Sequence, residues 1–354
     1  MVKIAALLLN SRMSPDDTSP ILTDLPPGQD RLFDIVFSII NYRTGEMTIA
    51  CVVSVLEDLL NSPGIHAHIA IVDNASGDGS ADEIAEWIAT QPEGTPVSLV
   101  RSPRNTGFSG GHNQGIGAAR GRYYLVLNSD AVVKPGFTRA MLDAAEAQPR
   151  GGLFAPRIDY DDGPQQNSCF RVPSPASELM RGAQTGPVTK VFRNYVVALD
   201  MPPAPEQIGW ASFAGILLRA EMIERVGLMD EGYFLYFEDT EYCLRARRAG
   251  WEILYVPEAR FVHFRGGSAP VKSLAKVRKR LPKYYYASRT RLLYQAHGWL
   301  GLIAANLAWH LGRGIAMLRV LAGKPVPRAN AKEWRDIWTN ALSPLGDSYG
   351  PREG

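Results

Sequence analysis

Short apolar runs alternate with helical patterns, and this alternation is the feature that most limits which folds the sequence can adopt. The first run, 35–40, is continuous and rich in β-branched and aromatic residues, which is typical of a strand buried in a parallel sheet. Further strands are predicted at 69–72, 97–100, 123–127 and 213–218, and helices at 46–60, 80–89, 111–120 and 220–226. Ser80 and Glu83 have the spacing of a capping box for the second helix. The alternation predicts an α/β fold whose mostly parallel sheet is flanked by helices and joined by right-handed crossovers.

Two aspartates stand where predicted strands end. Asp73 follows the strand at 69–72 and Asp130 follows the strand at 123–127, each among Asn, Ser or Gly residues. Ligands of open parallel sheets bind beyond the carboxyl ends of the strands, so both side chains are expected to converge on one crevice. A single strand-end aspartate is more commonly a turn or cap residue, and that alternative stays open for each of them alone.

The composition excludes several classes of protein. With 45% hydrophobic and 21% charged residues, the 354-residue chain is not dominated by disorder and can bury a large core. Lys and Arg total 38 against 36 acidic residues, so no nucleic-acid partner is expected. Cys51, Cys169 and Cys243 lack C-x-x-C spacing, which argues against disulfides or a thiolate zinc site and favours a cytoplasmic location.

Three regions are predicted along the chain. They are an N-terminal strand and loop extension over 1–34, an α/β domain over 35–270, and a basic, amphipathic helical region over 271–354. The apolar run 4–9 is too short for a signal peptide and no cleavage site follows it, so a short strand is predicted. Residues 155–205 show little periodicity and are predicted to form loops.

The C-terminal region combines cations with apolar residues. Lysines and arginines surround Tyr284–Tyr286, and the apolar pattern over 298–321 is interrupted by Asn306, His310 and Arg313 at helical spacing. This predicts either peripheral binding to the anionic inner face of the cytoplasmic membrane or a helix packed on the core or on a second subunit of a homodimer. The uninterrupted apolar stretch of about 18 residues that a membrane span requires is absent.

Five segments in a fixed order carry the functional signal. They are Asp73–Ser76, Asn105–Asn113, Leu127–Asp130, Met229–Glu241, and His263 with Gly266-Gly267-Ser268. Each segment alone is weak evidence for a function, because Gly-rich loops and strand-end aspartates are common in proteins. In this order and spacing, over about residues 35–270, they resemble the family 2 glycosyltransferases, particularly the bacterial rhamnosyltransferase-like branch. The resemblance implies a GT-A fold, here with a C-terminal helical extension, and a role in cell-envelope polysaccharide biosynthesis.

The resemblance also implies a site for a nucleotide-diphosphate sugar. Asp73 takes the position of the aspartate that binds the base, with Asn41 beside it. A glycine-rich loop leaves room for a phosphate to approach the backbone. The implied donor is a dTDP- or UDP-sugar, with a GDP-sugar also compatible. The implied donor-binding residues are Asn41, Asp73, Asn105, Gly107, Gly111, Asn113, Asn128, Ser129 and Asp130.

Asn128-Ser129-Asp130 stands in the place of the family's D-x-D metal motif. By that position, Asp130 is expected to coordinate Mg²⁺ or Mn²⁺, and His263 matches the histidine that completes the metal site in part of the family. Such a cation neutralises the charge that grows on the departing diphosphate. Asn128 replaces the first aspartate of the motif, which leaves fewer negative ligands.

Glu238-Asp239 resembles the family's E-D motif, whose aspartate is the general base. Asp239 is therefore expected to take the proton of an acceptor hydroxyl, on a glycan or a lipid-linked sugar, in a single displacement that inverts the anomeric configuration. Asp230, Glu238 and Trp210 are expected to contact this acceptor or to support the loop. Glu238 and Asp239 would also stabilise the N-terminus of a helix that follows them, and this role is compatible with a role in catalysis. The Q-x-x-R-W motif of processive synthases is missing, which indicates one transfer per binding event.

Two other functions compete with this interpretation. A catalytically idle scaffold that binds nucleotide sugars would share every donor residue, and Asn128 in place of aspartate favours it. A nucleotidylyltransferase would carry a Gly-rich, Arg- and Lys-bearing loop after its first strand, a pattern that Asn41-Tyr42-Arg43-Thr44-Gly45 fits poorly.

Overall fold

The computed structural model describes residues 32–264 and 271–350. The predicted strand at 4–9 and Gly266-Gly267-Ser268 lie outside the described residues. The chain forms two compact units, the first drawn from 1–168, 211–229 and 245–268 and the second from 169–210, 230–244 and 269–354. This division differs from the predicted ranges 35–270 and 271–354, because two segments inside the first range pack with the C-terminal region.

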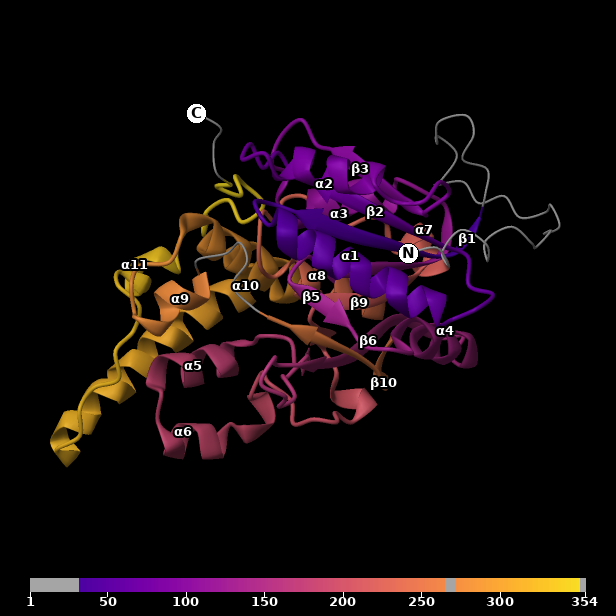
Figure 1. Cartoon of the computed structure of the whole chain (residues 1–354). Coiled ribbons are helices and arrows are strands. Elements are labelled where there is room, and N and C mark those ends of the chain that lie inside the picture. Colours follow the sequence, from indigo (N-terminus) through magenta and orange to yellow (C-terminus); the bar gives the residue numbers. More distant parts are fainter. Residues whose placement is uncertain (1–31, 265–270, 351–354) are drawn as a thin grey trace. The chain divides into compact units, whose positions relative to one another are not determined.

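The first unit is built around a mixed eight-stranded sheet. Its strands are β1 (Phe33–Asn41), β2 (Ala67–Asp73), β3 (Val97–Arg101), β4 (Gly121–Asn128), β5 (Ala131–Val133), β6 (Gly151–Asp159), β9 (Gly215–Arg219) and β10 (Glu252–His263). They lie in the order β3-β2-β1-β4-β9-β6-β10-β5 (Figure 1). The first four are mutually parallel, as predicted, and β6 is parallel to β10. Strand β9 runs antiparallel to β4 and β6, and β5 runs antiparallel to β10.

Helices cover both faces of this sheet. They are α1 (Gly45–Leu60), α2 (Ser80–Ala89), α3 (Gly107–Ile116), α4 (Phe137–Ala147) and α7 (Ala220–Val226). On one face, Phe37 and Leu125 of the strands share a core with Val55 of α1 and Met141 of α4. On the other face α3 packs against β1 and β2. The helix predicted at 111–120 begins four residues earlier than expected, at Gly107. Its first turn thus contains glycines of the segment that was predicted to form a glycine-rich loop.

The second unit contains a two-stranded sheet and several helices. They are β7 (Cys169–Phe170), β8 (Trp210–Ala211), α5 (Pro175–Ala183), α6 (Gly186–Val191), η2 (Arg193–Tyr195), η3 (Pro205–Gln207), α9 (Val271–Lys276), α10 (Lys283–Met317), η4 (Leu318–Ala322) and α11 (Glu333–Asp336). Helix α8 (Glu238–Arg248) begins in this unit. The prediction of loops over 155–205 was wrong for α5, whose first turn is capped by Ser174 and which packs along α10 (Figure 1).

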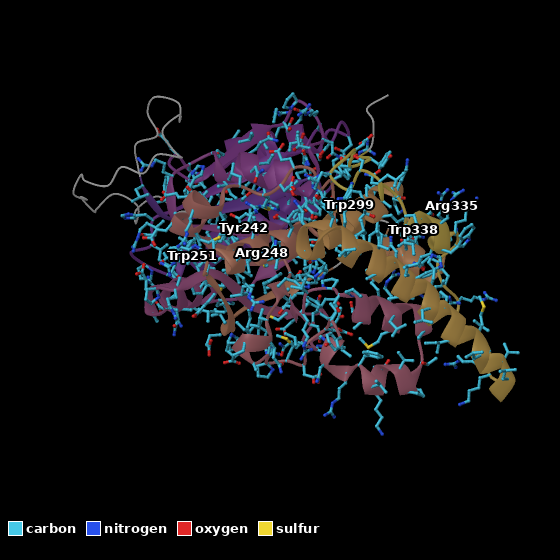
Figure 2. The ribbon with its side chains drawn as sticks, turned by 180° about the vertical axis from the view of Figure 1, so that it is seen from behind. Tyr242, Arg248, Trp251, Trp299, Arg335 and Trp338 are labelled. Carbon is cyan, nitrogen blue, oxygen red and sulfur yellow. The ribbon has the colours of Figure 1, made fainter. Side chains whose placement is uncertain are left out.

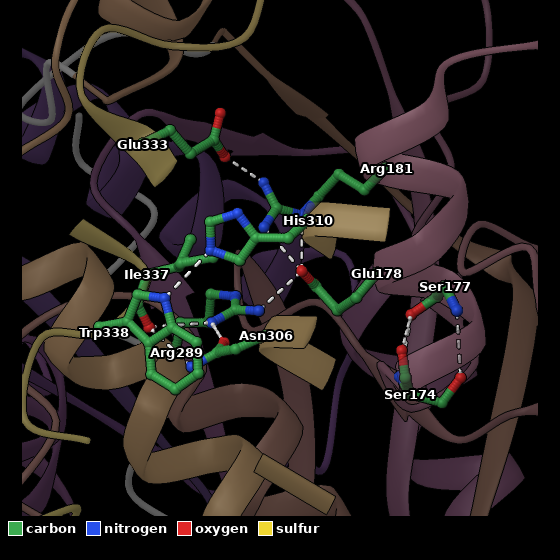
Figure 3. A network of polar contacts seen from close by, with 10 residues as sticks. All are labelled: Ser174, Ser177, Glu178, Arg181, Arg289, Asn306, His310, Glu333, Ile337 and Trp338. Atoms are coloured by element: carbon green, nitrogen blue, oxygen red, sulfur yellow. Dashed lines mark hydrogen bonds and ion pairs between the residues drawn. The ribbon is translucent and has the colours of Figure 1, made fainter. Parts of the chain in front are cut away.

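A buried ion-pair network joins α5 to α10 (Figure 3). One carboxylate oxygen of Glu178 accepts hydrogen bonds from Arg181 at 2.6 Å and from Arg289 at 2.7 Å. Burial by itself raises the pKa of this carboxyl, but the two guanidinium groups outweigh it and lower the pKa to about 2. Arg289 also donates to Asn306 Oδ1 at 2.8 Å, and Arg313 donates to the carbonyl of Gly182. Asn306 and Arg313, two of the polar residues that interrupt the apolar pattern of this helix, therefore face the interior of the unit.

Helix α10 is broken once. Gly298 has φ 68°, a left-handed conformation that glycine adopts without steric cost, and it separates two helical segments. In the described part of the chain, no helix combines the length and the apolar content that crossing a bilayer requires.

Candidate active site

The ends of β1 and β2 are tied together by side chains. Asn41 and Asp73 are paired in the parallel register, and Asn41 Nδ2 donates to Asp73 Oδ1 at 2.7 Å. The same carboxylate oxygen accepts from Ser76 Oγ at 2.6 Å, and Asn41 Oδ1 accepts from the backbone N–H of Thr44 at 3.0 Å. Both Asn41 and Asp73 are buried. These two residues thus hold the two strand-end loops in one conformation.

An open cavity of about 460 Å³ lies beside these loops. Its lining residues come from the starts of α1 and α2 and from the preceding loops: Arg43, Thr44, Gly45, Glu46, Met47, Asp78, Gly79, Ser80 and Glu83. Hydrogen bonds from Ser80 lower the pKa of the exposed Asp78 carboxyl. Arg43 is held by a bond from its Nε to the carbonyl of Ser76 at 3.0 Å. Arg43 and Asp78 were not predicted as site residues, although both lie in the polar loops that follow predicted strands.

The glycine-rich segment forms the start of α3. Asn105 Oδ1 accepts from the N–H of Gly107, whose φ of 71° is left-handed. A Cβ on Gly111 would approach Ile40 Cδ1 to 2.8 Å, so this glycine allows α3 to lie close against β1. Asn113 exchanges two hydrogen bonds of 3.0 Å with the backbone of Met229. Asn113 thereby anchors the chain immediately before Asp230.

His112, on the same helix, belongs to the core. It has no exposed surface, and its Nδ1 lies 2.9 Å from Ser38 Oγ. Burial lowers the pKa of this imidazole to about 3, so it is neutral at physiological pH. It packs edge-on against Phe108. This histidine supports the placement of α3 and is not exposed for direct contact with a ligand.

Asn128, Asp130 and His263 come together at the ends of three strands. His263 Nε2 lies 3.1 Å from Asp130 Oδ1 and 3.3 Å from Asn128 Nδ2. The antiparallel register of β10 with β5 pairs His263 with Ala131. The histidine therefore lies beside Asp130, which precedes Ala131 in the chain. The backbone carbonyl of His263 accepts from Gln166 Nε2 at 3.1 Å. The nearness of Asp130 to His263 that the sequence predicted is present.

Ser129 and the hydroxyl of Thr44 link this cluster to the start of α1. Their oxygens are 3.1 Å apart. The residues predicted to bind the donor, Asn41, Asp73, Asn128, Ser129 and Asp130, lie at the carboxyl ends of the neighbouring strands β2, β1 and β4. Cys51, whose Sγ approaches the carbonyl of Asn128, is buried, and burial raises the pKa of its thiol. This thiol stays protonated and is not suited to bind a metal.

The chemistry of the Asp130 and His263 side chains fits a divalent cation. A carboxylate oxygen and an imidazole nitrogen suit Mn²⁺, and the carboxylate also suits Mg²⁺. Among the described residues, no group of three His, Cys, Asp or Glu side chains could enclose a metal ion. Further ligands could be protein oxygens nearby, such as those of Asn128 or Ser129, or oxygen atoms of a bound diphosphate or of water. This pattern is consistent with a cation that binds together with its substrate.

The expected acceptor residue Asp230 is fully engaged within the second unit. Its two oxygens accept from Arg291 at 2.9 and 3.0 Å, and Gln295 and the N–H of Gly232 add further bonds. Burial raises the pKa of Asp230, but these bonds outweigh it and lower the pKa below its ordinary value. The bidentate pair with Arg291, which the sequence analysis did not foresee, supports the loop that follows.

Glu238 and Asp239 begin α8 and have different environments. Glu238 is buried, and its Oε2 has no hydrogen-bond partner in the described part of the chain. Burial, and next the charge of Asp239, raise the pKa of Glu238 well above its ordinary value. Asp239 is partly exposed, and its Oδ1 accepts from the N–H of Thr240 at 2.7 Å. Of the two, Asp239 is the carboxylate that solvent and a substrate can reach.

Trp210 lies in β8, where its ring stacks on Phe170 with the centroids 4.2 Å apart. Its indole N–H donates to the carbonyl of Arg171 at 3.0 Å. These contacts fix β8 against β7 and leave the ring half-buried.

Comparisons with known proteins agree with this arrangement. Residues 37–186 match the family model "Glycosyl transferase family 2", and residues 188–338 match "Glycosyl transferase family group 2". The N-acetylglucosaminyl-diphospho-decaprenol L-rhamnosyltransferase of Mycobacterium tuberculosis is 29% identical over 273 residues, which cover 70% of this chain and 81% of that protein. The low-salt glycan biosynthesis hexosyltransferase Agl10 of Haloferax volcanii is 24% identical over 62% of this chain and 64% of its own length.

The fold is also found among solved glycosyltransferases. The crystal structure of GalNAc-T7 with UDP, GalNAc and Mn²⁺ aligns with a TM-score of 0.52 at 15% identity, covering 85% of this chain and 60% of that one. This likeness concerns the fold, which is GT-A. Together with the two adjoining family matches, it leads to one conclusion: the chain belongs to family 2 of the glycosyltransferases and is a glycosyltransferase enzyme.

Proposed function

We propose that this enzyme transfers a hexosyl or deoxyhexosyl group from a nucleotide-diphosphate sugar to a hydroxyl of a glycan or lipid-linked acceptor. The observation that carries the proposal is the approach of His263 to Asp130 at 3.1 Å, at the carboxyl ends of strands whose loops also hold Asn41 and Asp73. Parallel strands end at this edge of the sheet, and ligands of open α/β folds bind there. The donor is proposed to be a dTDP- or UDP-sugar, or a GDP-sugar.

The proposed cofactor is Mg²⁺ or Mn²⁺, held by Asp130 and His263. When bound, the cation would neutralise the charge of the departing nucleoside diphosphate. The structure of GalNAc-T7 was determined with UDP and Mn²⁺, which supports a divalent metal without identifying it here. Arg43 at the cavity beside β1 supplies a further positive charge for an anionic donor.

Asp239 is proposed as the general base. Its carboxylate would accept the proton of the acceptor hydroxyl while that oxygen attacks the anomeric carbon opposite the leaving diphosphate. One displacement of this kind inverts the anomeric configuration. Glu238 is buried and burial raises its pKa, so it is less well placed than Asp239 to meet the acceptor hydroxyl. We further propose that transfer is non-processive.

The acceptor is proposed to be a lipid-linked glycan intermediate of the cell envelope, met on the cytoplasmic side of the membrane. The Mycobacterium tuberculosis relative is named as acting on N-acetylglucosaminyl-diphospho-decaprenol, and Agl10 is named for glycan biosynthesis. These names support the class of acceptor. The three cysteines are buried and form no disulfide, which is compatible with a reducing compartment.

The test is a panel of nucleotide sugars incubated with the purified chain, with Mg²⁺, with Mn²⁺ and with a chelator. The expected result is metal-dependent release of nucleoside diphosphate from one donor class, accelerated by a polyprenyl-diphosphate sugar. The anomeric proton coupling of the product, measured by NMR, is expected to report inversion. Donor binding without any release, in the presence of both metals and acceptor, would identify an idle scaffold instead.

A further inference from the structure

Helix α10 has two apolar faces on opposite sides. Leu302, Ala305 and Trp309 are buried on the side that packs along α5. The opposite side exposes leucine and isoleucine residues that recur at helical spacing and continue into η4. We call this the outer face: Leu300, Ile303, Leu307, Leu311, Leu318 and Leu321.

The outer face is open to solvent along its whole length. Leu300 and Leu321, at its two ends, are each 85% exposed, and Leu307 and Leu311 between them are 56% and 61% exposed. Single exposed leucines are ordinary on a protein surface, but a continuous row marks an interaction site. Trp299 and Trp338, labelled in Figure 2, are also partly exposed in this unit. Tryptophan favours the boundary between apolar and aqueous surroundings.

The charged residues over 259–332 are all lysines and arginines. The sequence contains no Asp or Glu between Glu258 and Glu333. Lys324, Arg328, Lys332 and Arg335 follow the outer face and are exposed. Glu333 itself is buried and ion-paired with Arg181.

Asp336, the next acid along the chain, is likewise buried and paired with Arg280, at 2.6 Å. Asp336 also lies 3.5 Å from Arg335 and so offsets one of the exposed cations. An apolar row followed by the exposed cations Lys324, Arg328 and Lys332 is complementary to a surface that is apolar inside and anionic outside.

We propose that the outer face of α10 and the cations from Lys324 to Arg335 dock the enzyme on an anionic lipid bilayer. The leucines would enter the level of the acyl chains, and the cations would lie at the headgroups. A second copy of the chain is a poorer occupant, because two such faces would bring the exposed lysines and arginines of both copies together. The inference deepens the proposed function, since it places the enzyme where a lipid-linked acceptor resides.

The test is co-sedimentation of the full-length protein with vesicles of phosphatidylcholine, with or without phosphatidylglycerol. Binding is expected on the anionic vesicles only, and to weaken with added salt. The double variant Leu307→Glu/Leu311→Glu is expected to bind at least about tenfold more weakly, because it places charges in the apolar row. The control Val191→Glu changes a residue on α6 that is 76% exposed, and it should bind like the parent.

Three results would overturn this proposal. One is the absence of binding to anionic vesicles even at low salt. Another is unchanged binding by the leucine variant, with its thermal unfolding matching that of the parent. The third is a dimer, seen by light scattering, that the leucine variant separates while vesicle binding persists. Vesicle binding does not depend on sugar transfer, so a failure of the proposed activity would leave the docking result interpretable.

Discussion

His263 Nε2 lies 3.1 Å from Asp130 Oδ1, although the two residues belong to distant parts of the sequence. The antiparallel pairing of β10 with β5 brings them together, and the N–H of Phe264 donates to the carbonyl of Asp130 at 3.0 Å. The pair is thus held by the backbone on both sides.

Replacing Asp130 with alanine is expected to abolish metal-dependent donor binding and to leave the fold intact. The reason is that the carboxylate is the anionic member of the proposed cation site. Affinity for a nucleoside diphosphate with Mn²⁺ should fall by at least about a hundredfold, measured by calorimetry. Asp162→Ala, at an exposed site in the same unit, is the matched control. Binding equal to that of the parent would show that Asp130 is not a ligand.

Replacing Asp239 with asparagine is expected to reduce turnover by at least about a hundredfold, with donor affinity little changed. Asparagine keeps the size of the side chain but cannot take a proton from the acceptor. Initial rates at saturating donor measure the effect, and Glu231→Gln, an exposed acid shortly before it in the chain, is the control. Near-normal turnover would show that Asp239 is not the base and would indicate Asp230 or Glu238 instead.

Glu238→Gln is expected to lose far less turnover than Asp239→Asn, by less than about tenfold. Burial raises the pKa of Glu238 well above its ordinary value, which favours the neutral form that glutamine resembles. The same rate assay compares both variants at neutral pH. A loss as large as that of Asp239→Asn would mean that the ionised form of Glu238 takes part.

Glu178→Gln is expected to lower the free energy of unfolding by about 3–5 kcal/mol, because it removes the charge that pairs with the buried Arg289 and the partly exposed Arg181. Chemical denaturation measures this, with exposed Glu206→Gln as control. The folded-state pKa of Glu178 is depressed to about 2, so its contribution is complete above the ordinary carboxyl pKa and is lost as pH falls towards 2. The variant should lack this part of the acid-induced loss of stability.

His112 is expected to stay neutral down to about pH 3, because burial disfavours its charged form. Since the unfolded chain would protonate near pH 6.5, the folded state loses stability as pH falls from that value towards 3. The carbon chemical shifts of the His112 ring, followed by NMR, should remain constant above this range. A midpoint near 6.5 would show that the side chain is accessible to solvent.

The parallel half of the sheet could be predicted because each strand carries its own local pattern. The strand at 35–40 and the helices at 80–89 and 220–226 were found from periodicity, close to their observed bounds. The predicted capping box failed, because Gly79 is the residue before α2 and Ser80 donates to Asp78 instead. Helix α5 was missed because its stability comes from packing and ion pairs with α10, which lies far along the chain.

The sequence by itself determined the order of the strands and helices, the family, and which polar residues follow the strands, because these properties depend on neighbouring residues. Only the tertiary structure decided which of those residues are buried. Asp73 holds the strand-end loops, Asp230 is ion-paired with Arg291, and Glu238 is buried while Asp239 stays partly exposed. Burial and ion pairing arise when distant segments pack together, and they set the charge of a carboxyl group.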